Sequence, residues 1–182
     1  MTSPYLEELH KELELGISEK EHPFRNCTLA TVGLDRMARL RTVVVRHLTD
    51  DFIFSFYTDK RSKKIVHIKE NNKVSLLFYH PGKLLQLKVE GLAMIRKDPK
   101  LLKPLWKNIE KAARKDYTTS RAPGTTLDHP DRLEYLSEED YFCLVEVHPY
   151  KIEYLKLNRP HHLRIRFSRK EDNTWKGEFL VP

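Results

Sequence analysis

Hydroxyl and ammonium groups gather where a predicted strand gives way to a predicted helix. Residues 55–72 read SFYTDKRSKKIVHIKENN, and Ser62, Lys63 and Lys64 stand at the start of the helical part. The free backbone N–H groups and the positive dipole end of a helix N-terminus favour an anion. The pattern therefore allows a phosphate pocket, although an isolated cluster of this kind is more often a solvated basic turn. Lys60 and Arg61 have no assigned partner and are expected to be the solvated part of the cluster.

Two arginines lie in the strand-like segment RLRTVVVR, residues 39–46. Strand alternation places Arg41 on the face of Val43 and Val45, whereas Arg46 shares the other face with Val44 unless the strand bulges. Arginines beside a ladder of valines would suit a flat ring that carries an anionic tail. Ordinary surface arginines are the competing interpretation.

The elements that must position these side chains are mostly short strands. An amphipathic helix is predicted over about residues 4–20, and further helices over 62–71 and from Asp98-Pro99 to about Ala113. Strands are predicted at 26–33, 34–48, 52–58, 73–79, 84–95, 141–149, 151–157, 163–169 and 175–182, with a hairpin turn at Gly33-Leu34-Asp35. This succession favours an α+β, mostly β, fold: an antiparallel barrel with a few peripheral helices. Residues 116–136 read as a long loop, a feature that is often functional.

Length and composition fit one folded domain over residues 1–182, with 40% hydrophobic and 32% charged residues. No apolar run approaches the roughly 20 residues that a membrane span needs. The start of the chain lacks the features of a secretory signal, so a cytoplasmic location is expected. The net charge of +7 favours anionic partners. Because the cations lie at strand ends and not in a continuous stripe, we expect no nucleic-acid partner.

We expect no metal site. His161 and His162 are neighbours in a strand-like segment, and neighbouring side chains of a strand point to opposite faces. Cys27 and Cys143 lie far apart and match no metal-ligand spacing, so both are expected to be buried thiols.

Five blocks in order resemble the pyridoxamine 5′-phosphate oxidase family of FMN-binding split-barrel proteins. The blocks are RTVVVR, FYTDKRSKK, NNKVSLLFYHPGKLLQLKVEGLA, YTTSR and HHLRIRFSRKEDNTWKGEFLVP, and together they span roughly residues 24–182. The resemblance implies an antiparallel split β-barrel that binds FMN and pairs with a second copy as a homodimer, with FMN at the subunit interface.

The resemblance also implies which residues contact FMN. Side chains of Arg41, Tyr57 and Thr58 and the backbone around Val43 and Val44 would contact the cofactor. Its phosphate would lie against Ser62, Lys63 and Lys64, where lysine replaces the family's arginine and loses the bidentate fork. Gln86 would reach the isoalloxazine ring, and Arg166 matches the last arginine of the family's R-L-H-D-R motif.

Substrate residues carry over less completely. Tyr117 and Arg121 match the family's Y-x-x-S-R element, which binds the phosphate of the vitamin; Thr125 stands at the next hydroxyl position, and Arg46 replaces the lysine that closes the first block. His162 and Arg164 stand where the R-L-H-D-R motif has arginine and histidine. Leu155 replaces the tryptophan of the family's E-F-W element.

The function that the resemblance implies is an FMN-dependent oxidoreductase similar to pyridoxamine/pyridoxine 5′-phosphate oxidase. Hydride would pass from the substrate to FMN, and oxygen would reoxidise the cofactor. An FMN-dependent oxidoreductase acting on another small substrate, or a non-catalytic protein that binds a flavin or pyridoxal phosphate, are the alternatives. No side chain stands out as a general base.

Overall fold

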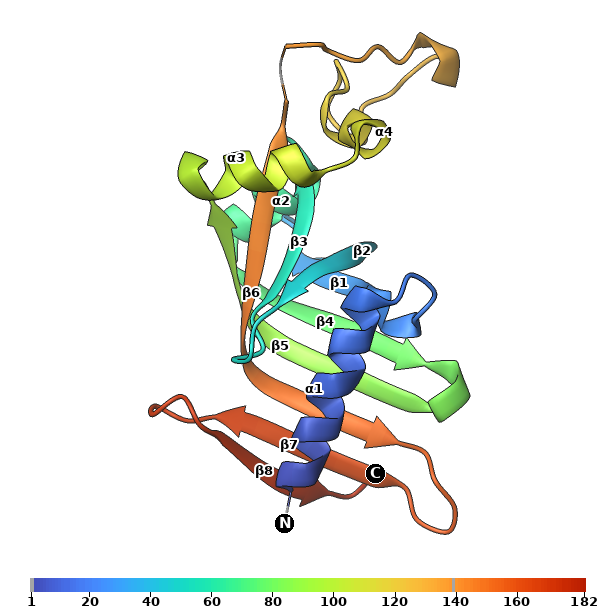
Figure 1. The fold of residues 1–182 in the computed structure, drawn as a ribbon, viewed down its shortest axis with the longest axis vertical. Coiled ribbons are helices and arrows are strands. Elements are labelled where there is room, and N and C mark those ends of the chain that lie inside the picture. The colour runs from blue at the N-terminus through green and yellow to red at the C-terminus, as the bar shows by residue number, and fades with distance from the viewer. Residues whose placement is uncertain (1, 139) are drawn as a thin grey trace.

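A computed structural model describes residues 2–138 and 140–182. Helices α1 and α2 and strands β1 to β5 come first along the chain, and β6 to β8 close it (Figure 1). The bounds of the helices are α1 Ser3–Ser18, α2 Lys63–Glu70, α3 Pro99–Asn108 and α4 Lys111–Arg114; those of the strands are β1 Asn26–Val32, β2 Ala38–Leu48, β3 Phe54–Asp59, β4 Lys73–His80, β5 Leu85–Arg96, β6 Phe142–Lys156, β7 Leu163–Arg169 and β8 Trp175–Leu180. Single turns of 3-10 helix, η1 to η4, cover Pro23–Arg25, Pro81–Lys83, Lys115–Tyr117 and Pro130–Arg132.

The strands form an antiparallel barrel that is closed by pairing between β3 and β6. The sheet order is β3-β2-β1-β4-β5-β6-β7-β8, and the additional β3–β6 ladder turns the first six of these strands into a ring. Strands β7 and β8 continue the sheet beyond the second half of β6. The predicted antiparallel split barrel with peripheral helices is therefore confirmed.

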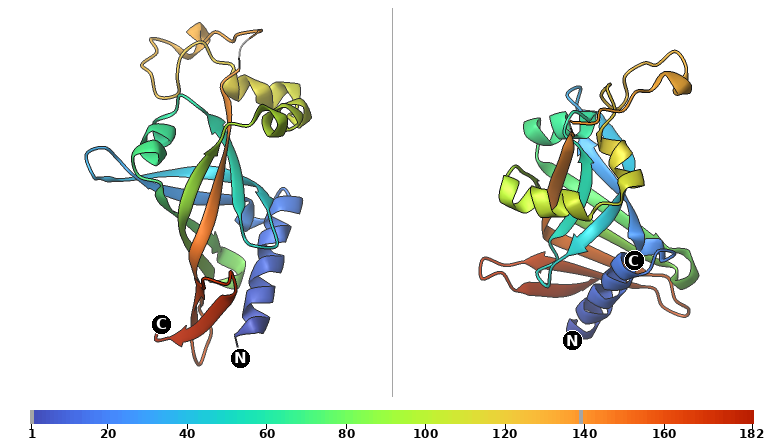
Figure 2. Two further views of the ribbon diagram at one scale, coloured as in Figure 1. Left: turned by 90° about the vertical axis from the view of Figure 1, so that its left-hand side faces the viewer. Right: turned by 45° about the horizontal axis from the view of Figure 1, so that its top comes forward.

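The core is filled by inward-facing side chains of the strands and by one face of helix α1. In β5, Leu85, Leu87 and Val89 are fully buried, whereas the polar residues between them face outward. Helix α1 packs along the sheet beside the barrel (Figure 2) and buries Leu9 and Leu13 in the same core. Cys27 and Cys143 are both buried free thiols, as expected.

Two predicted boundaries were wrong. Residues 141–149 and 151–157 were predicted as separate strands, but β6 is one strand of 15 residues. Pro149 does not end it, because Gly91 pairs with Pro149 while Glu90 pairs with Lys151, which leaves Tyr150 as the extra residue of a β-bulge. A Cβ at position 91 would lie 2.7 Å from the His148 carbonyl oxygen, so this close approach requires glycine.

The helix predicted from Asp98-Pro99 to Ala113 is interrupted. Helix α3 ends at Asn108, Ile109 is extended, and the short α4 follows. The Arg114 guanidinium donates to the carbonyl oxygens of Lys107 and Ile109 at 2.8 and 2.9 Å. These bonds satisfy carbonyl groups that the end of α3 leaves without a helical partner.

The described residues of the loop 117–141, all but 139, and helices α3 and α4 lie at one end of the molecule, and β7 and β8 lie at the other (Figures 1 and 2). No helix in the described part of the chain is long and apolar enough to cross a membrane.

The packing of α1 gives a test of the core. Leu9 is fully buried whereas Leu15, on the same helix, is 37% exposed. We expect Leu9→Ala to lower the free energy of unfolding by about 2–5 kcal/mol, because it removes transfer energy and leaves a cavity. Leu15→Ala is expected to lower it by only about 0.5 kcal/mol. Urea titration of both variants measures the two free energies. Equal losses for the two variants would contradict the packing of α1 on the barrel.

Candidate functional site

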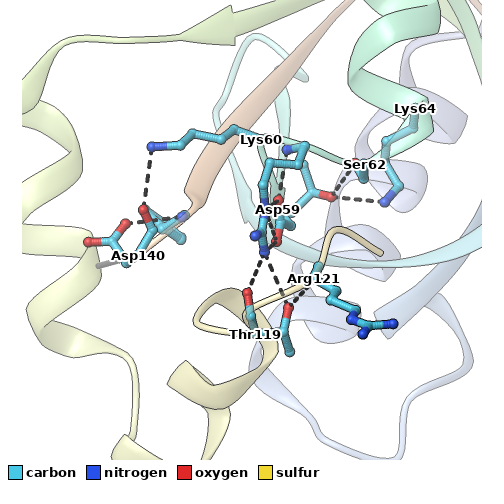
Figure 3. A network of polar contacts seen from close by, with 10 residues as sticks. Asp59, Lys60, Ser62, Lys64, Thr119, Arg121 and Asp140 are labelled. Carbon is cyan, nitrogen blue, oxygen red and sulfur yellow. Dashed lines mark hydrogen bonds and ion pairs between the residues drawn. The ribbon is translucent and has the colours of Figure 1, made fainter. Parts of the chain in front are cut away.

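The N-terminus of α2 gathers hydroxyl and ammonium groups. Ser62 is the N-cap residue and is 3% exposed, and its side chain makes no capping hydrogen bond. Its Oγ lies 3.3 Å from Thr58 Oγ1, and Lys64 Nζ donates to the same Thr58 oxygen at 2.8 Å. Figure 3 shows Ser62 and Lys64 side by side in this arrangement. The side chain of Lys63, by contrast, is exposed to solvent.

Arg41 lies on the other side of the same cluster, on the strand face that also carries the buried residues Val43 and Val45. Its Nη1 donates to Thr31 Oγ1 at 2.7 Å, and that oxygen lies 3.0 Å from His67 Nδ1 on α2. Burial lowers the pKa of the Arg41 guanidinium. Thus Arg41, Thr58, Ser62 and Lys64 are brought together between β2, β3 and α2.

The electrostatics of this cluster fit an anion. Burial lowers the pKa of the Lys64 ammonium, and the positive charge of Arg41 lowers it further. Among the described residues, neither cation forms an ion pair with a carboxylate; the nearby Asp59 pairs with Arg61 at 2.7 Å. Two partly buried cations, two hydroxyls and a helix N-terminus form a set of donors whose hydrogen-bond partners in the described part of the chain are all neutral oxygens, which suits the phosphate of FMN.

Tyr57 and Arg46 face a cleft of about 380 Å³ on the outer side of the barrel. The Arg46 Cζ atom lies 5.7 Å from the centre of the Tyr57 ring, and His47 Nε2 lies 2.8 Å from the Tyr57 hydroxyl. The register of β2 shifts between Val45 and His47, and this irregularity interrupts the alternation of faces along the strand at Arg46. Arg41 and Arg46 therefore lie in different places, the first in the α2 cluster and the second in the cleft.

Three basic residues of this cleft were missed by sequence reasoning. Lys20, Arg25 and His47 line it together with Arg46, Tyr57, Tyr117 and the acidic Glu110. Lys20 and Arg25 come from the segment between α1 and β1, which carries no motif. Burial, and then the charge of Arg46, lower the pKa of His47, which favours the neutral imidazole. The fixed cations of the cleft are thus Lys20, Arg25 and Arg46.

The candidate substrate residues of the long loop are divided between two places. Tyr117 lines the cleft, but Arg121 and Thr125 line a separate pocket of about 350 Å³ within the loop. Arg121 donates to the Thr126 carbonyl oxygen at 3.1 Å. Residues four apart share a face in a regular helix or strand, but the chain is irregular after Tyr117. The structure therefore does not bring Arg121 and Thr125 to Arg46.

Gln86, Arg164 and Arg166 lie on the outer face of the sheet. Gln86 is half-buried between its strand partners Tyr79 and Leu155. Arg164 pairs with Glu153 and Arg166 with Glu178, both at 2.8 Å. Ladder partners connect Arg41 to Val89 across three strand spacings, about 14 Å along the barrel wall. Gln86 lies three residues beyond Val89, so this group is distant from the α2 cluster. His162 is exposed, in a hollow with Arg159 and Pro160.

Lys60 and Arg61 were expected to be the solvated part of the cluster; Lys60 is indeed exposed, but for Arg61 the expectation was wrong. Arg61 pairs with Asp59 and also donates to Thr119 at 2.9 Å. Lys60 Nζ donates to the Asp140 carbonyl oxygen at 3.4 Å and lies 5.2 Å from the centre of the Tyr141 ring. Sequence patterns could not predict the contacts with Thr119 and Asp140, because these partners are about 60 to 80 residues away in the sequence.

A second polar cluster lies beneath α1, where ligand atoms of Glu12, His22 and His80 come within 4.8 Å of one another. Each histidine accepts a backbone N–H at Nδ1, from Phe24 and Lys83 respectively. The proton of each neutral imidazole must then reside on Nε2, which leaves no lone pair there for a metal. Glu12 is already paired with the Lys83 ammonium. The cluster therefore does not have the chemistry of a metal site.

Comparisons with known proteins agree with the geometry. A family model described as "Pyridoxamine 5'-phosphate oxidase, FMN-binding domain" matches residues 2–97, more than half of the chain. A pyridoxine/pyridoxamine 5′-phosphate oxidase of Wolbachia pipientis is 25% identical in an alignment 170 residues long, which covers 85% of this chain and 77% of that protein. The corresponding protein of Aliarcobacter butzleri is 42% identical over 64 residues, 35% of this chain but only 30% of the relative. The chain therefore matches less than a third of that relative's length.

Solved structures share the fold. A pyridoxamine 5′-phosphate oxidase-related, FMN-binding protein from Nostoc punctiforme superposes with a TM-score of 0.79 at 22% identity, covering 98% of both chains. PhzG from Burkholderia lata, solved with tetrahydrophenazine-1-carboxylic acid, also gives 0.79, at 19% identity over 98% of this chain and 92% of that one. The residues matched by the family model include β1 to β5 and α2. The chain thus belongs to the pyridoxamine 5′-phosphate oxidase family, through its FMN-binding domain.

Proposed function

We propose that the protein is an FMN-dependent oxidoreductase that acts on a small anionic substrate, in the manner of pyridoxine/pyridoxamine 5′-phosphate oxidase. The observation that carries the proposal is the Lys64 ammonium, which is partly buried beside Arg41 and whose hydrogen bond goes to a neutral hydroxyl. A desolvated cation in this state is stabilised by an anion that enters the cluster. The phosphate of FMN is such an anion, and the family model describes an FMN-binding domain.

The cleft beside Tyr57 offers a place for the substrate. Tyr57, Tyr117, Leu105 and Ile109 supply aromatic and apolar surface, which suits a flat ring. Lys20, Arg25 and Arg46 supply three positive charges against one carboxylate, that of Glu110. An aromatic ring with an anionic substituent matches both features.

When bound, FMN supplies a hydride acceptor that molecular oxygen can reoxidise. The residues of this chain would bind and orient both partners. Arg41, Ser62 and Lys64 would hold the cofactor phosphate, and Arg46 would hold the anionic group of the substrate. The Tyr57 hydroxyl is held by His47, so the tyrosine ring has a fixed position in the cleft wall. Because burial raises the pKa of Tyr57 and of Tyr117, both hydroxyls keep their protons near neutral pH and can donate them in hydrogen bonds.

A second candidate is an FMN-dependent oxidoreductase with a substrate other than the vitamin phosphate. It is favoured by the positions of Arg121 and Thr125, which line a pocket apart from Arg46 and Tyr117. The presence of Leu155 at the position of the family's tryptophan favours it as well. Both candidates share the cofactor and the cationic cleft.

We further propose that the active form is a homodimer. Gln86 and Arg166 cannot reach the α2 cluster of their own chain. In a dimer, these residues of one copy could instead contact the flavin bound at the α2 cluster of the other copy. The outer face that carries Gln86 also exposes the apolar side chains of Leu77, Tyr79, Leu92 and Met94, which are 39–50% accessible. Several exposed apolar side chains on one sheet face are typical of protein–protein interfaces.

The phosphate site is tested by comparing two adjacent lysines. We expect Lys64→Ala to weaken FMN binding at least tenfold, because it removes the buried cation, whereas the exposed Lys63→Ala changes it about twofold. Riboflavin, which lacks the phosphate, is expected to bind both variants like the unmodified protein. Fluorescence titration measures all four affinities. Equal losses of FMN and riboflavin affinity in Lys64→Ala would contradict the phosphate role.

The cleft is tested with pyridoxal 5′-phosphate, a chromophoric aromatic phosphate. Arg46→Gln is expected to raise its Kd about tenfold, since a cation facing the ligand is lost. Arg121→Gln serves as the matched control and is expected to change the Kd less than threefold, because Arg121 faces the other pocket. The reverse order, measured by absorbance titration, would place the anion in the loop pocket instead of the cleft.

The dimer is tested at Tyr79, the strand partner of Gln86. Tyr79→Lys places a charge on the apolar outer face and is expected to convert dimers to monomers in sedimentation velocity. FMN affinity is expected to fall in parallel, because Gln86 and Arg166 of the second copy are lost. Leu15→Lys, on α1, is the control and is expected to leave both unchanged. A Tyr79→Lys monomer with undiminished FMN affinity would contradict a cofactor site shared by two copies.

A further inference from the structure

Asp59 holds Arg61 in a fixed position at the end of β3. The Asp59 side chain is 3% exposed and accepts the Arg61 backbone N–H at 2.7 Å. The Arg61 guanidinium donates to both carboxylate oxygens, with Nη2 to Oδ2 at 2.7 Å. A buried carboxylate is costly without a counter-charge, and the two-point contact fixes the plane of the guanidinium.

The Arg61 guanidinium also contacts both ends of the loop 117–141, through a hydrogen bond at one end and a stacked ring at the other. Nη2 donates to the Thr119 carbonyl oxygen at 2.9 Å and to Thr119 Oγ1 at 3.2 Å, near the start of the loop (Figure 3). At the end of the loop, the Tyr141 ring stacks on the guanidinium, with 3.2 Å from Cζ to the ring centre. The backbone of Tyr141 bonds to Lys60 N and to Tyr117 O, both at 2.8 Å. The two ends therefore meet at Arg61.

Above this base, the loop is held by a short ladder. Ser120 N donates to Glu134 O at 2.8 Å and Leu136 N to Thr118 O at 2.7 Å, around a bridge between Thr119 and Tyr135. The 121–133 segment beyond it is largely exposed. Because Thr119 belongs to both the ladder and the Arg61 contact, the position of the ladder depends on Arg61.

The same turn carries the phosphate cluster on its opposite side. Ser62 follows Arg61 directly, and its N–H donates to the Asp59 carbonyl oxygen at 3.0 Å. Thr58 precedes Asp59, and its hydroxyl oxygen accepts a hydrogen bond from the Lys64 ammonium. The turn 58–64 thus presents one side to an anion and the other to the loop that carries Tyr117.

We propose that Arg61 is a positioning residue that couples occupation of the phosphate cluster to the order of the loop 117–141. A phosphate that fixes Thr58, Ser62 and Lys64 restrains the turn, and Arg61 passes that restraint to Thr119 and Tyr141. The coupling is reciprocal, so a ligand held by Tyr117 in the cleft strengthens FMN binding in turn. The identity of the anion as FMN rests on the proposed function; the contact between Arg61 and the loop does not.

The test is hydrogen exchange at the amides of Ser120, Leu136 and Tyr141, whose bonds lie at the loop base. In the unmodified protein, FMN is expected to slow their exchange about fivefold or more, whereas riboflavin, without a phosphate, does not. Arg61→Lys keeps a positive charge for Asp59, so the fold is maintained, but a single ammonium cannot bond Asp59 and Thr119 in the same planar fork. In this variant the slowing by FMN is expected to vanish, while the Kd for FMN changes less than threefold.

Two controls separate this coupling from general loosening. Lys60→Gln alters the neighbouring cation and is expected to retain the protection by FMN. In Arg61→Lys, the affinity for pyridoxal 5′-phosphate is expected to fall about fivefold, because Tyr117 is less well placed, while exchange in β5 is unchanged. Equal protection by FMN in Arg61→Lys and the unmodified protein would overturn the proposal. Failure of the unmodified protein to bind FMN would instead overturn the proposed function; faster exchange at the three amides of ligand-free Arg61→Lys would still establish the contact with the loop.

Discussion

Pairing between β3 and β6 is the constraint on which the site depends. Without it the sheet would be open, and Thr58 and Asp59 would end a free edge strand. The ladder places Thr58 opposite Cys143 and Asp59 opposite Phe142, so the end of the long loop arrives beside the turn that precedes α2. The closure of the barrel thereby brings into contact a polar turn and a loop that are distant in the sequence. Long-range ladders of this kind determine which loops can share a site.

The charges around this closure are arranged in two different ways. Asp59 and Arg61 neutralise each other, and their pair stabilises the turn without leaving charge for a ligand. Arg41 and Lys64 have hydroxyl and carbonyl partners instead, so their positive charge remains available. Under the proposed function, two residues of one basic cluster have different roles: Arg61 positions the turn, and Lys64 would face the anion. Net charge alone does not distinguish these roles.

Much of the fold could be predicted because its signals are local. The alternation in β5, the hairpin turn after Gly33 and the start of a helix at Ser62 each depend on residues a few positions apart, and the structure contains all three. The role of Arg61 could not be predicted, since its partner Thr119 is 58 residues away and reaches it through barrel closure. Spacing was also insufficient for Arg121 and Thr125, because it does not determine the path that an irregular loop takes after Tyr117. Pro149 was misread as a strand end because the bulge that accommodates it requires Gly91 on the neighbouring strand.

The central claim is that the N-terminus of α2 holds the cofactor phosphate between partly buried cations, and phosphorus NMR of the FMN complex tests it directly. A free phosphate monoester takes up its second proton with a pKa of about 6. Next to Arg41 and Lys64 the dianion is stabilised, so the pKa falls. The account predicts that the phosphorus chemical shift of bound FMN stays constant between about pH 5.5 and 8. A shift that titrates with a midpoint near 6, as in free FMN, would contradict it.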